Sequence, residues 1–378
     1  MAIKRTVAIV TMHRVLNYGS ILQTLALYRY LEKIGYNPVV VDYKFPNEYH
    51  MKVAVESNRA QYGSKLRVHL NGLCNRIIKP VDAHRIDGFS EIFNKYLRLT
   101  KTYENETEIN RSPVEADIYL TGSDQVWNPR WIGRDLTFFL SWVPENRKKI
   151  AFGSSFGSKW LNEDELAFFA PYLKKYDTIS VREDNDILPQ IGIQNKIVLD
   201  PTFLLDKKEW CEIFDPKPMI AGKYILCYLI LYSFNPFPYA YEVVRKIKRE
   251  TGYKVVMIAG EPLNILKGYK VINDCTPKEF LNLFFNASYV VTSSFHGTAF
   301  AINFGIPFTT IVDDMSDKDN RQASLLQFVG LGRNGILRKG QDLNEFKIMQ
   351  GDYSIGLLET RRSESTVFLK NSLDFSYE

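Results

Sequence analysis

Cysteine and histidine are scarce in this chain, which has four Cys and five His among its 378 residues. The cysteines form no CxxC pair and have no His-rich surroundings; they are Cys74, Cys211, Cys227 and Cys275. This spacing argues against a zinc site and against a disulfide framework. We therefore expect a reduced, cytoplasmic compartment and no bound metal.

Long hydrophobic runs are also missing. The most apolar stretch, YILCYLILY from Tyr224, is far shorter than the roughly 20 residues that a membrane-spanning helix needs. The short apolar run near the N-terminus ends at His13 and Arg14, too early for a secretory signal. Both runs predict buried strands.

No strong excess of one charge is present, because the formal net charge is only +5. Such a balance does not indicate a nucleic-acid partner. Residues 44–101 are an exception, since Lys and Arg outnumber Asp and Glu there. The segment is either a solvated helical insertion or a basic surface for a phosphorylated or lipid-linked acceptor, with peripheral contact at the inner face of the membrane.

An acidic stretch, DDMSDKD from Asp313, is the other run of like charges. Its spacing differs from that of a calcium loop, and it predicts a solvated surface turn.

Alternating strands and helices fill the first half of the chain. A β-branched strand at residues 6–11 precedes the turn NYGS, an amphipathic helix that ends at Gly35, and the strand PVVVDY. Further strands are expected at residues 117–121, 149–152, 178–181 and 196–199. This βαβ order predicts a doubly wound parallel sheet with ligands at the carboxyl ends of its strands.

A second α/β set begins at Lys223. It includes helices at residues 239–251 and 277–285, the strands KVVMIAG, YVVTS and PFTTIV, and the helices HGTAFAINF and RQASLLQFVGLG. A turn-rich stretch with Pro201, Pro216 and Pro218 predicts a linker before it. The fold class is therefore α/β, with two Rossmann-like domains facing across a cleft.

We expect the first domain to span residues 1–212 and to contain the basic helical insertion at about 44–101. The second domain spans residues 213–352. Residues 353–378 form a C-terminal segment, helical at 357–373, that docks back on the first domain.

The junction TSSFHGT is the first candidate site. A helix that begins near Gly297 leaves backbone N–H groups for an anion, and His296 stands beside them. This histidine then donates a hydrogen bond to phosphate or acts as a general acid; the alternative is a capping or core histidine. The candidate binding residues here are Ser293, Ser294, Gly297 and Thr298.

The turn NYGS is the second candidate. Gly19 allows close approach of a ligand to the backbone, and the neighbouring side chains are polar. Helix capping by Asn17 or Ser20 is an alternative that is compatible with binding. The candidates are Asn17, Tyr18, Gly19 and Ser20.

The loop TGSDQVWNP, after a buried strand, is the third. Asp124 is either a base toward a sugar hydroxyl or a turn former, and Trp127 offers a flat face to a sugar ring. The remaining binding candidates of this loop are Gly122, Ser123, Gln125 and Asn128.

Arg182, in ISVRE, is the candidate cation at a strand end. Its guanidinium either binds a carboxylate or phosphate of a ligand, or pairs with Glu183 or Asp184.

The order of these motifs carries a family resemblance. NYGSILQTLALYRYLEKIGY, TGSDQVWNP, SVRE, DPTFLL, SSFHGTAFAINFGIP and RQASLLQFVGLG together resemble the polysaccharide pyruvyl transferase family over most of the chain. The resemblance implies two Rossmann-like domains in a fold similar to that of B-type glycosyltransferases, with the active site between the domains and the donor bound by the second one, residues 213–352. It also implies phosphoenolpyruvate as donor, a sugar of an exopolysaccharide or capsule as acceptor, a pyruvate ketal as product with release of phosphate, and no cofactor.

The family's motif histidine matches His296, and its strand-end arginine matches Arg182. On this reading Arg182 and the helix start at Gly297 hold the donor, while His296 protonates it and Asp124 activates the sugar. Many members have an arginine where this chain has Ser294. Either another cation replaces it, or the donor differs. A glycosyltransferase that uses a nucleotide sugar and a non-catalytic glycan-binding relative are the competing interpretations.

Overall fold

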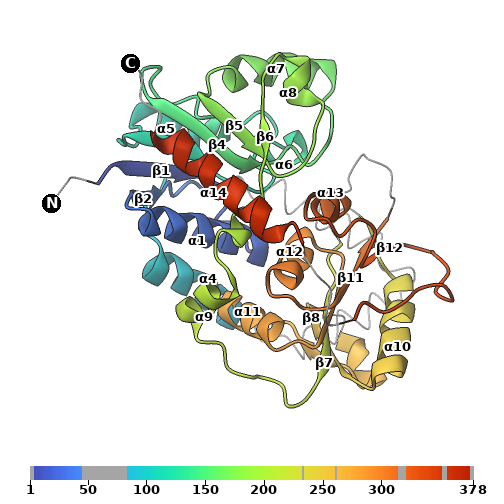
Figure 1. Ribbon diagram of the computed structural model, residues 1–378. Coiled ribbons are helices and arrows are strands. Elements are labelled where there is room, and N and C mark those ends of the chain that lie inside the picture. The colour runs from blue at the N-terminus through green and yellow to red at the C-terminus, as the bar shows by residue number, and fades with distance from the viewer. Residues whose placement is uncertain are drawn as a thin grey trace, which may run out of the picture.

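The computed structural model describes residues 4–44, 83–231, 234–259, 262–313, 321–350 and 356–374. These residues form two six-stranded sheets, in which the paired strands are all parallel. The two sheets occupy the upper and lower parts of Figure 1. The predicted α/β class with two Rossmann-like domains is confirmed.

The first sheet has the strand order β2-β1-β3-β4-β5-β6. The chain runs from β1 outward to β2 and then returns to β3 on the other side of β1, so the carboxyl ends of β1 and β3 flank the switch point where ligands bind in such sheets. The strands are β1 (Thr6–Val10), β2 (Asn37–Val40), β3 (Ile118–Thr121), β4 (Lys148–Ser154), β5 (Thr178–Val181) and β6 (Lys196–Ile197).

The second sheet has the order β12-β11-β10-β7-β8-β9, and its switch point lies between β7 and β10. Strands with helices on both faces read as almost continuous apolar runs, as YILCY does in β7. The strands are β7 (Tyr224–Tyr228), β8 (Lys254–Ile258), β9 (Lys270–Ile272), β10 (Tyr289–Thr292), β11 (Phe308–Val312) and β12 (Ile336–Arg338).

Helices and single turns connect the strands. Those of the first half are α1 (Tyr18–Lys33), α4 (Ala83–Glu91), the π-helical turn η1 (Ile92–Tyr96), α5 (Glu106–Arg111), α6 (Pro129–Ile132), η2 (Thr137–Phe139), α7 (Glu163–Leu173) and α8 (Ile187–Gln190). Those that follow β6 are η3 (Pro201–Phe203), α9 (Lys207–Phe214), α10 (Tyr239–Thr251), η4 (Pro262–Lys267), α11 (Pro277–Phe285), α12 (Phe295–Asn303), α13 (Arg321–Phe328) and α14 (Leu358–Asp374).

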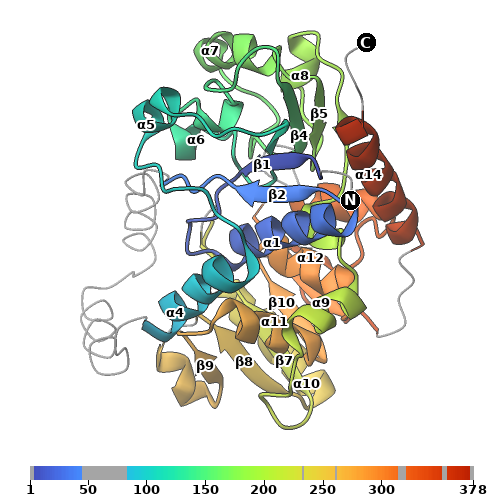
Figure 2. The same cartoon turned by 90° about the vertical axis from the view of Figure 1, so that its left-hand side faces the viewer.

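Helices α1 and α12 lie between the two sheets, as both views show (Figures 1 and 2). Both are buried along most of their length, which explains why their sequences are apolar on nearly every side. Tyr18 of α1 stacks on Phe280 of α11 at 4.4 Å between ring centroids and donates a hydrogen bond to the Cys275 carbonyl. The two halves therefore share one hydrophobic core.

Helix α14 crosses back onto the first half (Figure 1). Leu369 and Leu373 are fully buried, and the Ser365 hydroxyl accepts a hydrogen bond from the Leu199 amide at 2.9 Å. Arg362 donates to the Phe203 carbonyl of η3 and to Asn303 of α12. The C-terminal helix thus contacts both halves of the molecule.

The expected linker contains more structure than its prolines predicted. Asp206 and Glu209 form a capping box that starts α9, so part of the stretch is helical.

Within the basic segment, α4 and η1 are helical, while residues 45–82 and 314–320 lie outside the described part of the chain. No helix among the described residues is both long and apolar enough to cross a bilayer.

Candidate functional site

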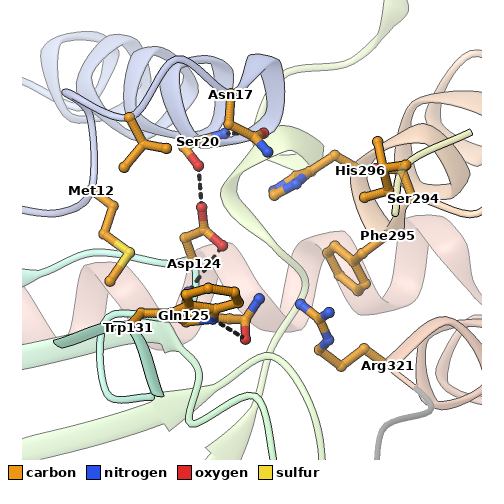
Figure 3. A pocket seen from close by; sticks show the side chains of 12 residues that line it. Met12, Asn17, Ser20, Asp124, Gln125, Trp131, Ser294, Phe295, His296 and Arg321 are labelled. Atoms are coloured by element: carbon orange, nitrogen blue, oxygen red, sulfur yellow. Dashed lines mark hydrogen bonds between the residues drawn. The ribbon is translucent and has the colours of Figure 1, made fainter. Parts of the chain in front are cut away.

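A cavity lies where the carboxyl ends of the two sheets face each other (Figure 3). The loops after β1 and β3 form one wall, and the loops after β7 and β10, with the start of α13, form the other. The cavity is therefore between the two switch points, where ligands bind in doubly wound folds. Its lining residues are Met12, Val15, Asn17, Ser20, Asp124, Gln125, Trp131, Ile230, Ser294, Phe295, His296 and Arg321.

Asp124 lies three positions after the last residue of β3 and has a backbone φ of 75°, a conformation that a residue with a side chain rarely adopts. The Ser20 hydroxyl of α1 donates a short hydrogen bond to its Oδ2, and the Gln125 amide donates to its Oδ1 at 2.9 Å. Burial alone would raise the pKa of Asp124, but the neighbouring Arg182 and His296 outweigh it and lower the pKa. This carboxylate is ionised and fixed at the cavity wall.

Arg182 lies behind this wall, with its side chain fully buried. Its three nitrogens each face a different carboxylate: Nε faces Glu183 at 3.2 Å, Nη1 faces Asp200 at 3.1 Å and Nη2 faces Asp124 at 3.4 Å. Burial lowers the pKa of Arg182, but these three carboxylates together raise it. The guanidinium holds the charged groups in place and does not line the cavity.

Asp200 follows β6 at the start of η3 and is 1% exposed. The Ser123 hydroxyl donates to its Oδ2 at 2.9 Å, the Thr202 amide donates to its Oδ1 at 3.0 Å, and His296 Nε2 lies 3.6 Å from Oδ2. Burial acts to raise the pKa of Asp200, and the adjacent His296 and Arg182 lower it well below its usual value. Asp200 thus links the guanidinium to the imidazole.

His296 comes from the first turn of α12 and is 7% exposed. Among the described residues its Nε2 has no hydrogen-bond partner, although it is buried at the cavity. Gly19 of the opposite half makes this position possible, because a Cβ at residue 19 would lie 1.9 Å from His296 Nδ1. The missing side chain of Gly19 leaves space for the imidazole of His296. The prediction from the sequence was that this glycine would allow a ligand to approach the backbone.

The start of α12 lies two residues earlier than the sequence predicted. Ser294 is the N-cap, and its side chain accepts a hydrogen bond from the Gly297 amide at 3.3 Å. The Gly297 amide is therefore occupied, and a Cβ there would lie 2.3 Å from Thr292 Oγ1. Thr298 is fully buried and bonds to Ser294 and Thr310. Gly297 and Thr298 are therefore wrong as ligand contacts. The first-turn amides that have no acceptor within the helix are those of Phe295 and His296.

Trp127 is wrong as a sugar platform. It is fully buried, it packs between Phe139 and Phe156, and its Nε1–H donates to the Phe138 carbonyl. Trp131, four residues after Trp127, lines the cavity, and its Nε1–H donates to Gln125 Oε1 at 3.0 Å. The aromatic face at the site belongs to Trp131.

Arg182 is wrong as a direct ligand for the donor, because its side chain is fully buried and surrounded by carboxylates. The predicted pairing with Glu183 is present, and two further carboxylates, from loops distant in sequence, join it.

Several other candidates stabilise the loops and helix ends through hydrogen bonds and packing, and they do not line the cavity. Tyr18 bonds to Cys275, Ser123 bonds to Gly153 and Asp200, and Ser293 exchanges hydrogen bonds with the Ile230 backbone. Gly122 packs on Thr11, and Asn128 caps α6 and donates to Gln125. Six predicted residues do line the cavity: Asn17, Ser20, Asp124, Gln125, Ser294 and His296. Asn17 also caps α1.

Sequence reasoning missed two charged residues of the site. Asp200 belongs to the predicted linker and to the family motif DPTFLL, but no role is predicted for it, although an acid directly after a predicted strand is a usable signal. Arg321 lies at the start of α13, and its side chain points toward the cavity beside Phe295 (Figure 3). It lies nine positions after Val312, the last residue of β11, so a search of the residues directly after strand ends does not identify it.

A model of the polysaccharide pyruvyl transferase family matches residues 17–314. The chain belongs to the polysaccharide pyruvyl transferase family. The matched segment contains Asp124, Arg182, Asp200 and His296, and it ends before Arg321. As a family member, the protein is assigned to the transferases.

Solved structures share the two-domain fold of this pyruvyl transferase family member. A protein described as a UDP-N-acetylglucosamine 2-epimerase from Listeria monocytogenes has a TM-score of 0.50 at 14% identity, with 99% of this chain and 90% of that chain covered. A UDP-GlcNAc 2-epimerase from Methanocaldococcus jannaschii gives 0.47 at 12% identity, with 100% and 94% covered. No curated protein sequence matches the chain. At 14% identity, the likeness to the Listeria monocytogenes protein shows the fold alone.

Proposed function

We propose that the protein transfers pyruvate from phosphoenolpyruvate to a sugar of a cell-surface glycan, such as an exopolysaccharide or capsule, to form a pyruvate ketal with release of phosphate. One observation carries this proposal: the buried His296 imidazole lines the cavity together with the Ser20–Asp124 pair, and its Nε2 makes no hydrogen bond to a described residue, with Asp200 Oδ2 at 3.6 Å. The family match supports the same reaction. The reaction requires no cofactor besides the donor.

The donor's anionic groups bind at the second-half wall. The first turn of α12 leaves the Phe295 and His296 amides without helical acceptors, and this is a favourable place for an anion. Arg321 supplies a guanidinium at the same wall, which replaces the arginine that many family members have in the position of Ser294. A charge-assisted contact of this kind contributes about 1.5–3 kcal/mol.

In the first step His296 gives a proton to the methylene carbon of the donor, and the electrons of the double bond form the new C–H bond. The adjacent carbon becomes cation-like, and a sugar hydroxyl oxygen bonds to it while Asp124 accepts the hydroxyl proton. Asp200 orients the imidazole, and Arg182 keeps both carboxylates charged.

In the second step the bond from this carbon to the phosphate oxygen breaks, and phosphate leaves with the electron pair and with the proton held by Asp124. A second hydroxyl of the same sugar then attacks, closes the ketal and returns a proton to His296. Both attacks come from one sugar, so the acceptor must be fixed in orientation. Trp131 offers the aromatic face for this at the cavity wall.

The test is phosphate release from phosphoenolpyruvate with galactose, mannose, glucose and lipid-linked oligosaccharide acceptors. We expect acceptor-dependent release, and a decrease in kcat of roughly 10²–10⁴-fold for His296→Asn. His84→Asn, at an exposed histidine that is not among the lining residues of the cavity, is the matched control. Release of a nucleotide from a UDP-sugar instead would identify a glycosyltransferase, and glycan binding without release of either would identify a non-catalytic protein.

A second test concerns the donor cation. Arg321→Gln should raise the KM for phosphoenolpyruvate roughly 10–100-fold, the factor that corresponds to one lost charge-assisted contact. Arg321→Lys should recover part of the loss, and Arg333→Gln, at an exposed arginine, should have no effect. An unchanged KM for Arg321→Gln contradicts the assignment.

A further inference from the structure

A second concave surface lies on the second half and shares no lining residue with the catalytic cavity. Helix α10 forms one side of this groove, and η4 forms another. The two elements are in contact there, since Lys267 Nζ of η4 lies 3.4 Å from the centre of the Tyr241 ring of α10. Its charged lining residues are five cations and one acid: Arg245, Lys246, Lys248, Arg249, Lys267 and Glu242.

The positive charge of the groove is only partly neutralised by neighbours. Lys246 pairs with Glu250 at 2.9 Å. For Arg245, Lys248 and Arg249, by contrast, no described carboxylate lies within ion-pair distance. Arg245 and Arg249 are exposed, and the Lys248 ammonium lies 5.5 Å from the Tyr269 ring centre. Cations gathered in this way attract a ligand with several negative charges.

Two exposed aliphatic side chains adjoin the groove through Lys267, one of its cations. Ile265 and Leu266 directly precede Lys267 in η4 and are 52% and 84% exposed. A soluble polyanion offers nothing for such side chains to bury into. A bilayer surface offers both an anionic headgroup layer and acyl chains, and exposed aliphatic residues beside Lys and Arg are typical of proteins that bind it.

We propose that the groove between α10 and η4 binds the surface of an anionic phospholipid bilayer, with the cations at the headgroups and Leu266 and Ile265 inserted among the acyl chains. This surface is distinct from residues 44–101, for which the sequence suggested membrane contact. The site would keep the enzyme where lipid-linked glycans are present. Binding to vesicles requires neither donor nor acceptor, so its test is independent of the transferase reaction.

The test is sedimentation of the full chain with vesicles of phosphatidylcholine containing 30 mol% phosphatidylglycerol, compared with pure phosphatidylcholine, at about 0.1 M salt. We expect binding to the anionic vesicles only. Arg245→Gln/Lys248→Gln should lower the partition coefficient roughly tenfold or more, since each cation near the surface contributes separately. Leu266→Ser should lower it roughly threefold.

The control is Lys208→Gln/Lys217→Gln, which removes two exposed cations elsewhere and should leave binding unchanged. Circular dichroism of each variant verifies that the fold is kept. Equal binding of wild type to both vesicle types, or full binding by the groove variant, overturns the proposal. Loss in the groove variant with no effect of Leu266→Ser also overturns it, because the cations would then contact the headgroups without insertion of the aliphatic side chains.

Discussion

Arg182 shows how one buried residue supports a site that it does not line. Three carboxylates surround its guanidinium, and the side chain is fully buried. Charges taken out of water are costly unless each has its partner, so the cluster is stable only while it is complete. The charge of Asp124 at the cavity wall depends on this arginine.

Replacement of this arginine should therefore be strongly destabilising. We expect Arg182→Met to lower the free energy of unfolding by about 3–5 kcal/mol at pH 7, measured by urea unfolding. Asp124 and Asp200 have lowered pKa values in the folded state, so their stabilisation is present above their unfolded pKa and is lost as the pH falls. The deficit of the variant should consequently shrink only below about pH 4, where these carboxyl groups begin to protonate in the unfolded chain. Lys175→Met, which breaks an exposed pair with Glu145, should cost less than about 1 kcal/mol.

Gly19 gives a second prediction at the scale of one residue. Gly19→Ala puts a methyl group on the His296 ring and should displace the imidazole. We expect a decrease in kcat of at least about tenfold in the phosphate-release assay, because small misplacements of reacting groups are costly. Gly356→Ala, where an added Cβ meets nothing within 4 Å, is the control. Unchanged kcat for Gly19→Ala would mean that the position of His296 does not matter for the reaction.

Among the elements, the carboxyl ends of β1 and β2 are joined by one carboxylate. Arg14 donates two hydrogen bonds of 2.6 Å to Asp42, Thr102 donates one of 2.6 Å, and His13 Nε2 lies 3.2 Å from it. Burial acts to raise the pKa of Asp42, but these partners lower it far below the usual range. The cluster holds the loop that carries Met12, Val15 and Asn17 to the cavity.

Asp42→Asn should lower the free energy of unfolding by about 3 kcal/mol at neutral pH, as for a broken buried ion pair. Because the folded pKa is lowered, the stabilisation by Asp42 is fully present above about pH 4 and declines in wild type only below it. The variant should therefore approach wild type in acid, as measured by unfolding curves from pH 7 to pH 3. Asp87→Asn, at an exposed position, serves as the comparison. A constant difference at every pH would contradict this account.

The elements were largely predictable from the sequence, and the side-chain network was not. The expected helices at residues 239–251 and 277–285 match α10 and α11, because their periodicity and caps are local signals. Of the three acids around Arg182, Glu183 is its neighbour in sequence, but Asp124 and Asp200 come from loops that only the folded sheet brings to it. Likewise, Trp127 and Trp131 are close in sequence, and packing alone decides which one faces the cavity.

On the scale of the whole molecule, the two halves are joined by α14 as well as by the chain between them. Arg362 donates to Phe203 at 2.8 Å and to Asn303 at 2.8 Å, and Asn303 donates in turn to Thr202 and Leu205. These contacts fix the distance between η3, which follows Asp200, and α12, which begins with the His296 turn. The geometry of the cavity therefore depends on a helix outside it.

Arg362→Leu should weaken this junction. We expect the free energy of unfolding to fall by about 1.5–3 kcal/mol and the single calorimetric transition to broaden or split, because the halves lose part of their coupling. Lys370→Leu, an exposed position on the same helix, should leave the transition unchanged. A sharp, unshifted transition for Arg362→Leu would show that α14 does not couple the halves.

The close approach of Gly19 to His296 also limits how this protein can be recombined. Gly19 belongs to the first half and His296 to the second. The missing side chain at position 19 serves this geometry only when the imidazole occupies the space beside it. A hybrid built from the first half of one relative and the second half of another must inherit both residues together. Separately chosen halves could each fold correctly and still produce an inactive enzyme.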